Sequence, residues 1–414
     1  MIRSMSSALS GMRAHQAMLD VVGNNISNVS TTGFKSSAAV FEDVLTQVTA
    51  GAGAPATEAG GTNPAQIGLG VRVAGIAQSM TQGALQRTGR AGDMSIQGDG
   101  FFVLSQNGAE TYTRGGNFTI DALGRLATID GGLVQGWQAG ATGVINSNLP
   151  VGGIVVRVGD QLPPNQTTAI RLGGNISSDA AVASTIQSAV SVFDQQGNEV
   201  LLQFTFTKTA ANAWTATATY GALLTPVALT DGALTFDGTG ELTAPIDHNI
   251  NIAGGLIPGF VDPIEIDLGA TGEAGRVTQY AGRKSLVVTE QDGFASGVLQ
   301  SYAVSPDGKL VGTYSNGRTQ NIAQVALTVF ANPEGLERIG GVWRQTANSG
   351  LSQIGVPNAG GRGQINPSTL ELSNVDLAQE FTNLIVAQRG FQANSRVITS
   401  SDEILQEIVN LKRG

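Results

Sequence analysis

The chain has 414 residues, a formal net charge of −9 and no cysteine. The length suits roughly two to four domains, and the lack of cysteine excludes disulfides and thiolate metal sites. Charged residues make up only 13% of the chain, about half the usual share. The negative charge and the absence of a basic cluster argue against a nucleic-acid partner. The sequence also lacks an apolar run of about 18 residues, so membrane insertion is not expected.

Both ends of the sequence show the spacing of amphipathic helices. Apolar residues recur there at alternating steps of three and four, which is the a/d pattern of a coiled coil. We expect the first helix to run from about residue 3 to residue 28. The residues of this apolar stripe are Ile2, Met5, Leu9, Met12, Leu19, Ile26, Leu377, Phe381, Leu384, Phe391, Ile398, Leu405 and Val409.

A helix with one narrow apolar stripe needs a partner to cover it. The partner is either the helix at the other end of the same chain or the equivalent helix of a neighbouring copy. Such a stripe is more often an ordinary core than an assembly surface. We favour assembly because the stripes lie at both termini and the region between them has a β pattern of its own.

Polar residues and glycines predict where the terminal helices end. Asparagines cluster at the end of the first helix and Gly33 follows them, a composition typical of helix termination. Ser373 is predicted to be the N-cap of the last helix, with Asp376 as its capping-box-like partner. Gly390 lies inside that helix, where it costs about 1 kcal/mol relative to alanine. It allows either close helix packing or local bending.

The middle of the chain predicts β structure. Residues 50–66 are rich in Ala, Gly, Pro and Thr and predict a connector without a core. Further on, an apolar strand, an Asp in the turn, a Gly and a second strand occur together three times, at 121–124, 194–197 and 307–308. This combination is typical of hairpins and therefore of antiparallel β domains.

We therefore predict a mainly β protein with terminal α-helices. The N- and C-terminal helices form a coiled-coil stalk, followed by stacked antiparallel β domains, one inserted in the other. The predicted parts are a terminal coiled-coil domain (1–30 and 370–414), an extended connector with short β elements (31–75), an inner β domain (76–149 and 286–369) and an inserted outer β domain (150–285).

Residue patterns for catalysis are missing from the sequence. Of the two histidines, His15 lies on the first helix and is expected to pack there or face solvent, and His248 stands alone. Neither an HExxH motif, a GxSxG motif nor a phosphate-binding loop is present. Adjacent carboxylates such as Asp402 and Glu403 are expected to be solvated. We expect no enzyme activity, no catalytic residue, no metal and no cofactor.

Several short motifs occur together at the two ends and in the first β region. Taken together they are highly specific, cover more than half of the chain and resemble the bacterial flagellar rod and hook proteins. A segment at 331–336 and the insertion resemble the hook members rather than the shorter rod subunits. The motifs are ALSGM (8–12), LD (19–20), Asn24, Asn25, Asn28, TTGFK (31–35, with Gly33, Phe34 and Lys35), GDGFF (98–102), YTR (112–114), SNVDLA (373–378), AQR (387–389, with Gln388 and Arg389), FQAN (391–394, ending at Asn394) and DEIL (402–405).

This resemblance implies a structural subunit of the flagellar hook. Such a subunit is exported unfolded through the flagellar type III export apparatus, without a cleavable signal peptide. Outside the cell, many copies form a homopolymer, a curved flexible tube that acts as a universal joint and transmits motor torque from rod to filament. The implied further partners are the hook cap, the distal rod and the hook–filament junction proteins.

Two other interpretations remain open. A distal rod subunit of the same family would form a straight, rigid tube. A secreted β-rich adhesin or enzyme with coiled-coil ends is a different class of protein. A ligand-dependent activity of residues 150–285 alone would favour it.

Overall fold

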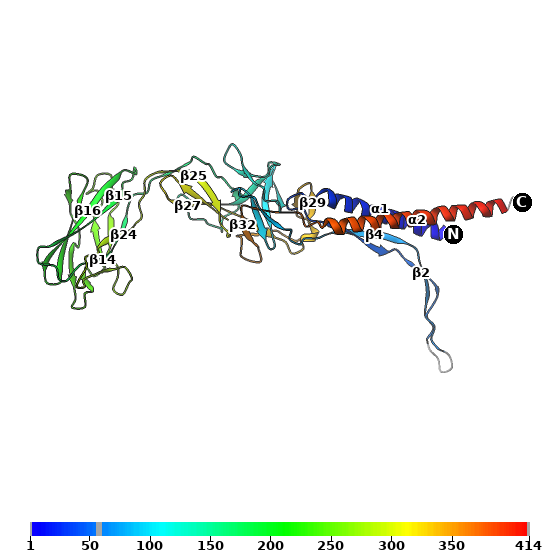
Figure 1. Ribbon diagram of the computed structural model, residues 1–414, viewed down its shortest axis with the longest axis horizontal. Coiled ribbons are helices and arrows are strands. Elements are labelled where there is room, and N and C mark those ends of the chain that lie inside the picture. Colours follow the sequence, from blue (N-terminus) through cyan, green and yellow to red (C-terminus); the bar gives the residue numbers. More distant parts are fainter. Residues whose placement is uncertain (1, 55–59, 412–414) are drawn as a thin grey trace. The chain divides into compact units, whose positions relative to one another are not determined.

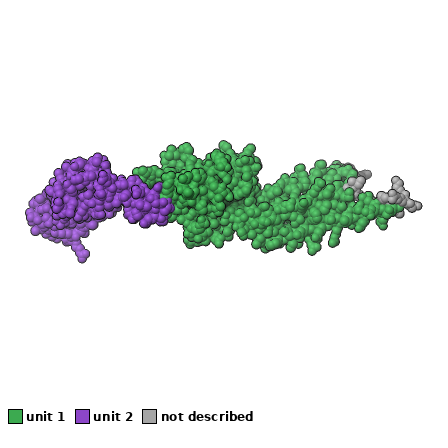
Figure 2. Space-filling model, turned by 90° about the horizontal axis from the view of Figure 1, so that it is seen from above, with its two compact units in different colours: residues 1–157, 302–311, 320–414 green, residues 158–301, 312–319 purple. Residues whose placement is uncertain are grey.

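The computed structural model describes residues 2–54 and 60–411. The chain forms two compact units, which Figure 2 shows in different colours. Unit 1 comprises residues 1–157, 302–311 and 320–414, and unit 2 comprises residues 158–301 and 312–319. Unit 2 is therefore an insertion in unit 1, but it extends beyond the predicted end at residue 285. The extension includes β24 (Val287–Gln291), which pairs with β14 (Ala169–Asn175).

Two long helices form the ends of the chain. Helix α1 (Ile2–Ser27) lies within one residue of the predicted range, and it runs antiparallel beside α2 (Leu377–Leu411) (Figure 1). The predicted N-cap of α2, Ser373, is wrong. Asp376 caps the helix instead, because its Oδ1 accepts a hydrogen bond from the Ala378 amide at 2.8 Å. Residues 373–375 lie outside the helix, and the Asn374 side chain bonds the segments around Ser36 and Ser79.

The β part of unit 1 is a set of short, mostly antiparallel ladders. Strand β7 pairs with β8, β11 and β28, and β11 also pairs with β27. The strands and the 3-10 helix are β1 (Ser37–Asp43), β2 (Thr46–Ala50), β3 (Ala65–Gly68), β4 (Val71–Gln78), β5 (Leu85–Arg87), β6 (Met94–Gln97), β7 (Phe101–Gln106), β8 (Ala109–Thr113), β9 (Thr119–Ile120), β10 (Leu126–Ala127), β11 (Leu133–Gln138), β12 (Gly152–Gly153), β27 (Thr319–Val325), β28 (Leu327–Val329), η1 (Pro333–Gly335), β29 (Glu337–Ile339), β30 (Val342–Arg344), β31 (Gln353–Gly355), β32 (Gln364–Pro367) and β33 (Thr369–Glu371).

Aromatic residues fill the core of this β part. Phe101 lies edge-on to both Phe330 and Trp343, with ring centroids 5.9 and 5.4 Å apart. Tyr112 meets Phe330 at 4.9 Å, and Trp137 is buried in the same cluster. Such edge-to-face pairs stabilise a core beyond the area that they bury.

The segment predicted as a connector, 31–75, is largely a β-hairpin. Strand β1 pairs antiparallel with β4, and β2 pairs antiparallel with β3. All residues of β2 and β3 are exposed. The described residues 44–54 and 60–69 carry no charged side chain. We refer to residues 44–54 and 60–69 as the arm; β2 is labelled in Figure 1.

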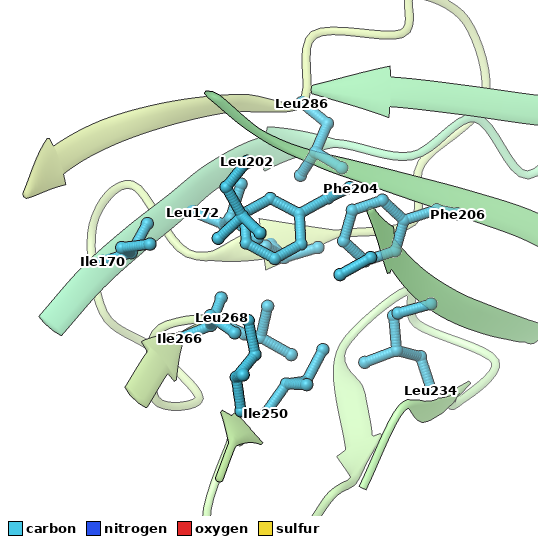
Figure 3. Close-up of a cluster of buried hydrophobic side chains, with 14 of the residues drawn as sticks. Ile170, Leu172, Leu202, Phe204, Phe206, Leu234, Ile250, Ile266, Leu268 and Leu286 are labelled. Carbon is cyan, nitrogen blue, oxygen red and sulfur yellow. The ribbon is translucent and has the colours of Figure 1, made fainter. Parts of the chain in front are cut away.

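Unit 2 contains two sheets around one core (Figure 3). One is a six-stranded antiparallel sheet, and the other is a five-stranded sheet in which β14 pairs in parallel with β22 and β23. This second sheet is therefore mixed. The strands are β13 (Gln161–Leu162), β14, β15 (Thr185–Phe193), β16 (Glu199–Ala210), β17 (Ala213–Tyr220), β18 (Thr225–Val227), β19 (Ala233–Phe236), β20 (Leu242–Ala244), β21 (Asn249–Ile252), β22 (Ile264–Asp267), β23 (Val277–Thr278) and β24; β25 (Gly297–Val304) and β26 (Lys309–Tyr314) contribute residues to both units.

The three predicted Asp–Gly turns are present, and a fourth occurs at 237–240. In each turn the glycine has a positive φ, from 77° to 85°. Asp121 and Asp194 accept hydrogen bonds from backbone amides two and four residues later. Asp237 does the same in the turn that we did not predict. The Asp carboxylate thus accepts hydrogen bonds from turn amides in place of a backbone carbonyl.

Candidate functional site

The two terminal helices meet through small side chains. Ala8, Gly11 and Ala14 on α1 are buried, as is Ala387 on α2. Val22 is buried further along the same side of α1. Small residues let two helix backbones approach closely, so this contact depends on shape rather than on large apolar area.

Gly390 and Gly11 each lie against a side chain of the other helix, with no room for a Cβ. A Cβ added at Gly390 would lie 2.4 Å from His15 Nε2, and one added at Gly11 would lie 2.8 Å from Asn394 Nδ2. Of the two expected roles of Gly390, close packing is therefore the one that the structure supports. His15 also meets Phe41 of β1 edge-on at 6.0 Å, and its Nδ1 is buried without a hydrogen-bond partner.

The predicted apolar stripe is only partly buried in the single chain. Leu9 remains 42% exposed and Phe381 52% exposed. On α1, the buried residues Ala8 and Gly11 each lie one position before a predicted residue, Leu9 and Met12. Of the predicted stripe, Met5, Leu377 and Phe391 are exposed, Met12, Leu19, Ile26, Leu384, Ile398 and Leu405 are half-buried, and the side chains of Ile2 and Val409 lie outside the described residues.

The TTGFK motif ends in a buried ionic cluster beside the helix pair. Glu371 of β33 lies 2.7 Å from Lys35 Nζ and 3.1 Å from Arg114 Nε. Lys35 is 2% exposed and Arg114 is 4% exposed. We call these three residues the junction triad, because they join the end of the α1 segment, the loop after β8 and the segment that leads into α2.

Hydrogen bonds to the backbone add to the ion pairs of the triad. Lys35 Nζ donates to the Thr81 carbonyl at 2.7 Å, and the Gly83 amide donates to Glu371 Oε1 at 3.0 Å. Burial lowers the pKa of Lys35, and the hydrogen bond and charge of Glu371 oppose this effect. Burial lowers the pKa of Arg114 in the same way, again against the charge of Glu371. Buried charges of this kind are tolerated only when they are paired.

Two asparagines and one glutamate tie the helices to this region. Asn25 Nδ2 donates to the Ser37 carbonyl at 2.7 Å and to Glu380 Oε1 at 3.2 Å, and Asn25 Oδ1 accepts from the Ser37 amide. Asn374 Oδ1 accepts from the Ser36 amide at 2.7 Å. The start of α2 and the end of α1 are therefore fixed to the same short segment.

The other motif residues fall into two groups. Gly33 has a φ of 68° and donates its amide to the Glu371 carbonyl at 2.8 Å, while Phe34 lies buried under the Arg338 guanidinium. Asn394 packs on Gly11 and donates to the Gly390 carbonyl. The residues with local or exposed positions are Asn24, Asn28, Gln388 and Arg389.

Sequence reasoning missed Glu371 and Arg114 as members of a site, although Arg114 stood in a recognised motif. For Glu371 the available signal was its place between two leucines, Leu370 and Leu372, whereas Arg114 lies between Thr113 and Gly115 and gave no such signal. Within the described ranges, no group of three or more His, Cys, Asp or Glu residues could hold a metal ion. The helices that the structure describes include none long and apolar enough to cross a membrane.

Four family profiles match the chain, and together they cover most of it. Residues 5–35 match "Flagella basal body rod protein" and residues 367–411 match "Flagellar basal body rod FlgEFG protein C-terminal". Residues 95–178 match "Flagellar hook protein FlgE/F/G D1 domain", and residues 163–294 match "Flagellar basal body protein FlaE D2 domain".

Similar proteins span the whole chain. The flagellar hook protein FlgE of Treponema pallidum is 36% identical, with 100% of both chains covered. FlgE of Escherichia coli K12 is 35% identical over 98% of this chain and 99% of its own length. The flagellar basal-body rod protein FlgG of Bacillus subtilis is 30% identical over 100% of both. The crystal structure of Helicobacter pylori flagellar hook protein FlgE2 shares the fold, with a TM-score of 0.54, 14% identity and coverage of 68% of this chain and 99% of that one.

Proposed function

The chain belongs to the flagellar hook and rod family, and we propose that it is the subunit of the flagellar hook, whose copies assemble into a curved, flexible tube. This tube acts as a universal joint between rod and filament. The full-length similarity to hook proteins supports the proposal. So does the apolar stripe that the helix pair leaves exposed.

The exposed stripe is the surface that we assign to self-assembly. Helix α1 uses its small residues to contact α2, so Met5 and Leu9 remain available to a second copy. The arm supports the same conclusion, because Leu45 is 67% exposed and Val48 and Ile67 are also exposed. A two-stranded hairpin is marginally stable by itself in water, so a neighbouring copy that covers it would stabilise it.

The finer assignments rest on the family. We infer export through the flagellar type III apparatus without a cleavable signal peptide, and a final location outside the cell. We infer the hook cap, the distal rod and the hook–filament junction proteins as partners at the ends of the tube. A cysteine-free chain suits passage in an unfolded form, because it cannot form disulfides before export.

Leu9→Asp tests the assignment of the stripe. Leu9 is 42% exposed in the single chain, so a charge there should change the thermal unfolding of the monomer only slightly. In a tube, the same charge would lie against apolar side chains at a cost of several kcal/mol. We expect no tubes in electron micrographs of Leu9→Asp and normal tubes from Leu9→Met. Normal tubes from both variants would show that the stripe faces solvent in the assembly.

A rod subunit is the second candidate, because a rod protein is also similar over the full length. Both candidates predict tubes of uniform diameter from the purified chain at high concentration. Curved tubes would support the hook subunit, and straight, rigid tubes would support the rod subunit.

A further inference from the structure

The sequence contains the dipeptide Asn-Gly twice, at residues 107–108 and 316–317. This dipeptide is chemically labile, because the main-chain nitrogen of the glycine can attack the side-chain carbon Cγ of the asparagine. Glycine has no Cβ that would hinder this approach. In a folded protein the reaction depends on how firmly the asparagine side chain and the glycine nitrogen are held. The two sites of this chain differ in that respect.

Asn107 and Gly108 form the tip of the hairpin between β7 and β8. Gln106 pairs with Ala109, so the loop has only these two residues. Both have a positive φ, 52° and 80°, as in a type I′ turn. Both are exposed, and within the described part of the chain neither the Asn107 side chain nor the Gly108 amide has a hydrogen-bond partner. The two reacting groups are therefore free to approach each other.

The second Asn-Gly pair lies in the turn between β26 and β27, and hydrogen bonds hold it in place. Asn316 Nδ2 donates to the Ala295 carbonyl at 2.7 Å, and its Oδ1 accepts from the Arg318 amide at 3.1 Å. The Gly317 amide donates to the Tyr314 carbonyl at 3.0 Å. The asparagine side chain and the attacking nitrogen are thus both engaged. Cyclisation at this site must first break these hydrogen bonds.

We propose that Asn107 is a site of spontaneous modification, at which the folded chain loses ammonia and gains a carboxylate. The Gly108 nitrogen gives its proton to solvent and attacks Asn107 Cγ. The side-chain amide group takes a proton from solvent and leaves as ammonia, so that a succinimide ring remains. Water then opens the ring at either carbonyl and gives aspartate or isoaspartate. The net reaction consumes water and releases ammonia, without an enzyme and without a change of oxidation state.

The product changes both the charge and the backbone of the hairpin. Either product adds a negative charge to a turn that already lies beside the exposed Glu110. Isoaspartate also routes the main chain through the former side chain, and the added methylene no longer fits a two-residue turn. Strand β8 leads from this turn to Tyr112 in the aromatic core and to Arg114 in the junction triad. The modification therefore acts at the start of a strand that connects to both.

Peptide mass spectrometry of the purified, folded chain tests the proposal, and the second Asn-Gly site is its internal control. Cleavage after Arg and Lys yields residues 91–114 and 310–318, each with a single asparagine. The folded chain is kept in mildly alkaline buffer, and the deamidated share of each peptide is followed with time. We expect Asn107 to react at least about tenfold faster than Asn316, because hydrogen bonds hold the latter site. In the chain unfolded by guanidinium chloride, the two sites should react at similar rates.

Asn107→Gln assigns the mass change to one residue. Glutamine would have to form a larger ring, so peptide 91–114 of this variant should stay unmodified. The same mass change in Asn107→Gln would overturn the proposal, because it would then arise at another residue.

The rates in the folded chain give the remaining outcomes. Equal rates at the two sites, or a faster reaction at Asn316, would overturn the proposal, since the hydrogen bonds would then not decide the reaction. A folded chain in which Asn107 stays intact while the unfolded chain reacts at both sites would also overturn it, because the turn would then protect the asparagine. The inference goes beyond the proposed function and needs only the folded chain, so its failure leaves that function standing.

Discussion

Glu371 holds two buried cations, so its replacement by glutamine tests the junction triad directly. The side chain lies 2.7 Å from Lys35 and 3.1 Å from Arg114, and both cations are almost fully buried. Glu371→Gln keeps the shape of the side chain but removes its charge. Removing one partner of a buried ion pair typically costs about 3–5 kcal/mol, because the remaining charge is left uncompensated. We expect a loss of this size in the free energy of unfolding of unit 1.

Tryptophan fluorescence can report on unit 1 alone. Trp137 and Trp343 lie in unit 1, whereas Trp214 lies in unit 2, so urea unfolding is followed in a Trp214→Phe background. Glu337→Gln is the control, because it makes the same substitution in the same unit. Glu337 Oε2 lies 2.6 Å from Arg344 Nη2, and both side chains of this ion pair are about half exposed. Exposed pairs contribute only about 0–1 kcal/mol, so the control should barely change the unfolding curve.

The loss in Glu371→Gln should also depend on pH. Burial already lowers the pKa of Lys35, and removing Glu371 removes the groups that oppose this. At pH values between the lowered pKa of Lys35 and its ordinary pKa of 10.5, Lys35 is protonated in the unfolded chain and deprotonated in the folded chain, so the unfolded chain binds more protons. The free energy of unfolding then rises with pH across this window. We expect the deficit relative to the parent chain to shrink as pH rises toward 10.5.

Two results would refute this reasoning. A loss in Glu371→Gln no larger than in Glu337→Gln would show that the two cations are solvated in the folded chain. A large loss that does not change with pH would show that Lys35 keeps its proton and that the penalty has another origin.

Three further predictions concern other parts of the chain. Gly390→Leu should destabilise the helix pair by about 1–3 kcal/mol through overpacking against His15, and it should reduce the hydrogen-exchange protection of α1 and α2 in tubes. Gly23→Ala is the control: a Cβ added at Gly23 would meet nothing within 4 Å, so this variant should not reduce the protection. Burial tends to raise the pKa of Asp194, but hydrogen bonds from Asn198 and from turn amides outweigh this and lower it. The stabilisation is therefore present at neutral pH and lost as pH falls through the lowered pKa, so Asp194→Asn should flatten the acid dependence of unfolding followed by Trp214 fluorescence. Asn165 and Phe294 exchange two backbone hydrogen bonds of 3.0 Å, so the two ends of the segment 166–293 lie side by side. Replacing this segment by an Asn-Gly turn should therefore leave a soluble chain whose tubes are straighter in micrographs. An insoluble product would show that unit 1 needs unit 2 in order to fold.

Local patterns in the sequence were sufficient to predict the helices and the hairpin turns. The step of three and four residues identified α1, and the Asp–Gly pairs identified three turns, because both features depend on residues close in sequence. The N-cap of α2 was wrong for the opposite reason. Ser373 has the right chemistry for a cap, but Asn374 beside it bonds residues about 300 positions away, which ties this segment to the β part of unit 1 before the helix begins.

The contact between the helices could not be predicted for a related reason. Large apolar residues such as Leu9 dominate a hydrophobic pattern, whereas the buried side of α1 is built from Ala8 and Gly11. Small residues form a contact only when a partner backbone can approach closely, and the sequence alone does not show that approach. Similarly, nothing near Glu371 in the sequence indicates that Lys35 and Arg114 surround it.

The junction triad also sets the order in which the chain can fold. Lys35 and Glu371 are 336 positions apart, so the ion pair closes a loop that includes all of unit 2 and most of the β part of unit 1. Until residue 371 is available, Lys35 and Arg114 cannot be buried without an unpaired charge, so we expect the segment that follows α1 to fold only afterwards. When the chain becomes available from its N-terminus onward, unit 2 can fold early, whereas the junction triad can form only after nearly the whole sequence is available. Contacts between such distant segments form slowly. The terminal helices would consequently be among the last parts of the chain to become ordered.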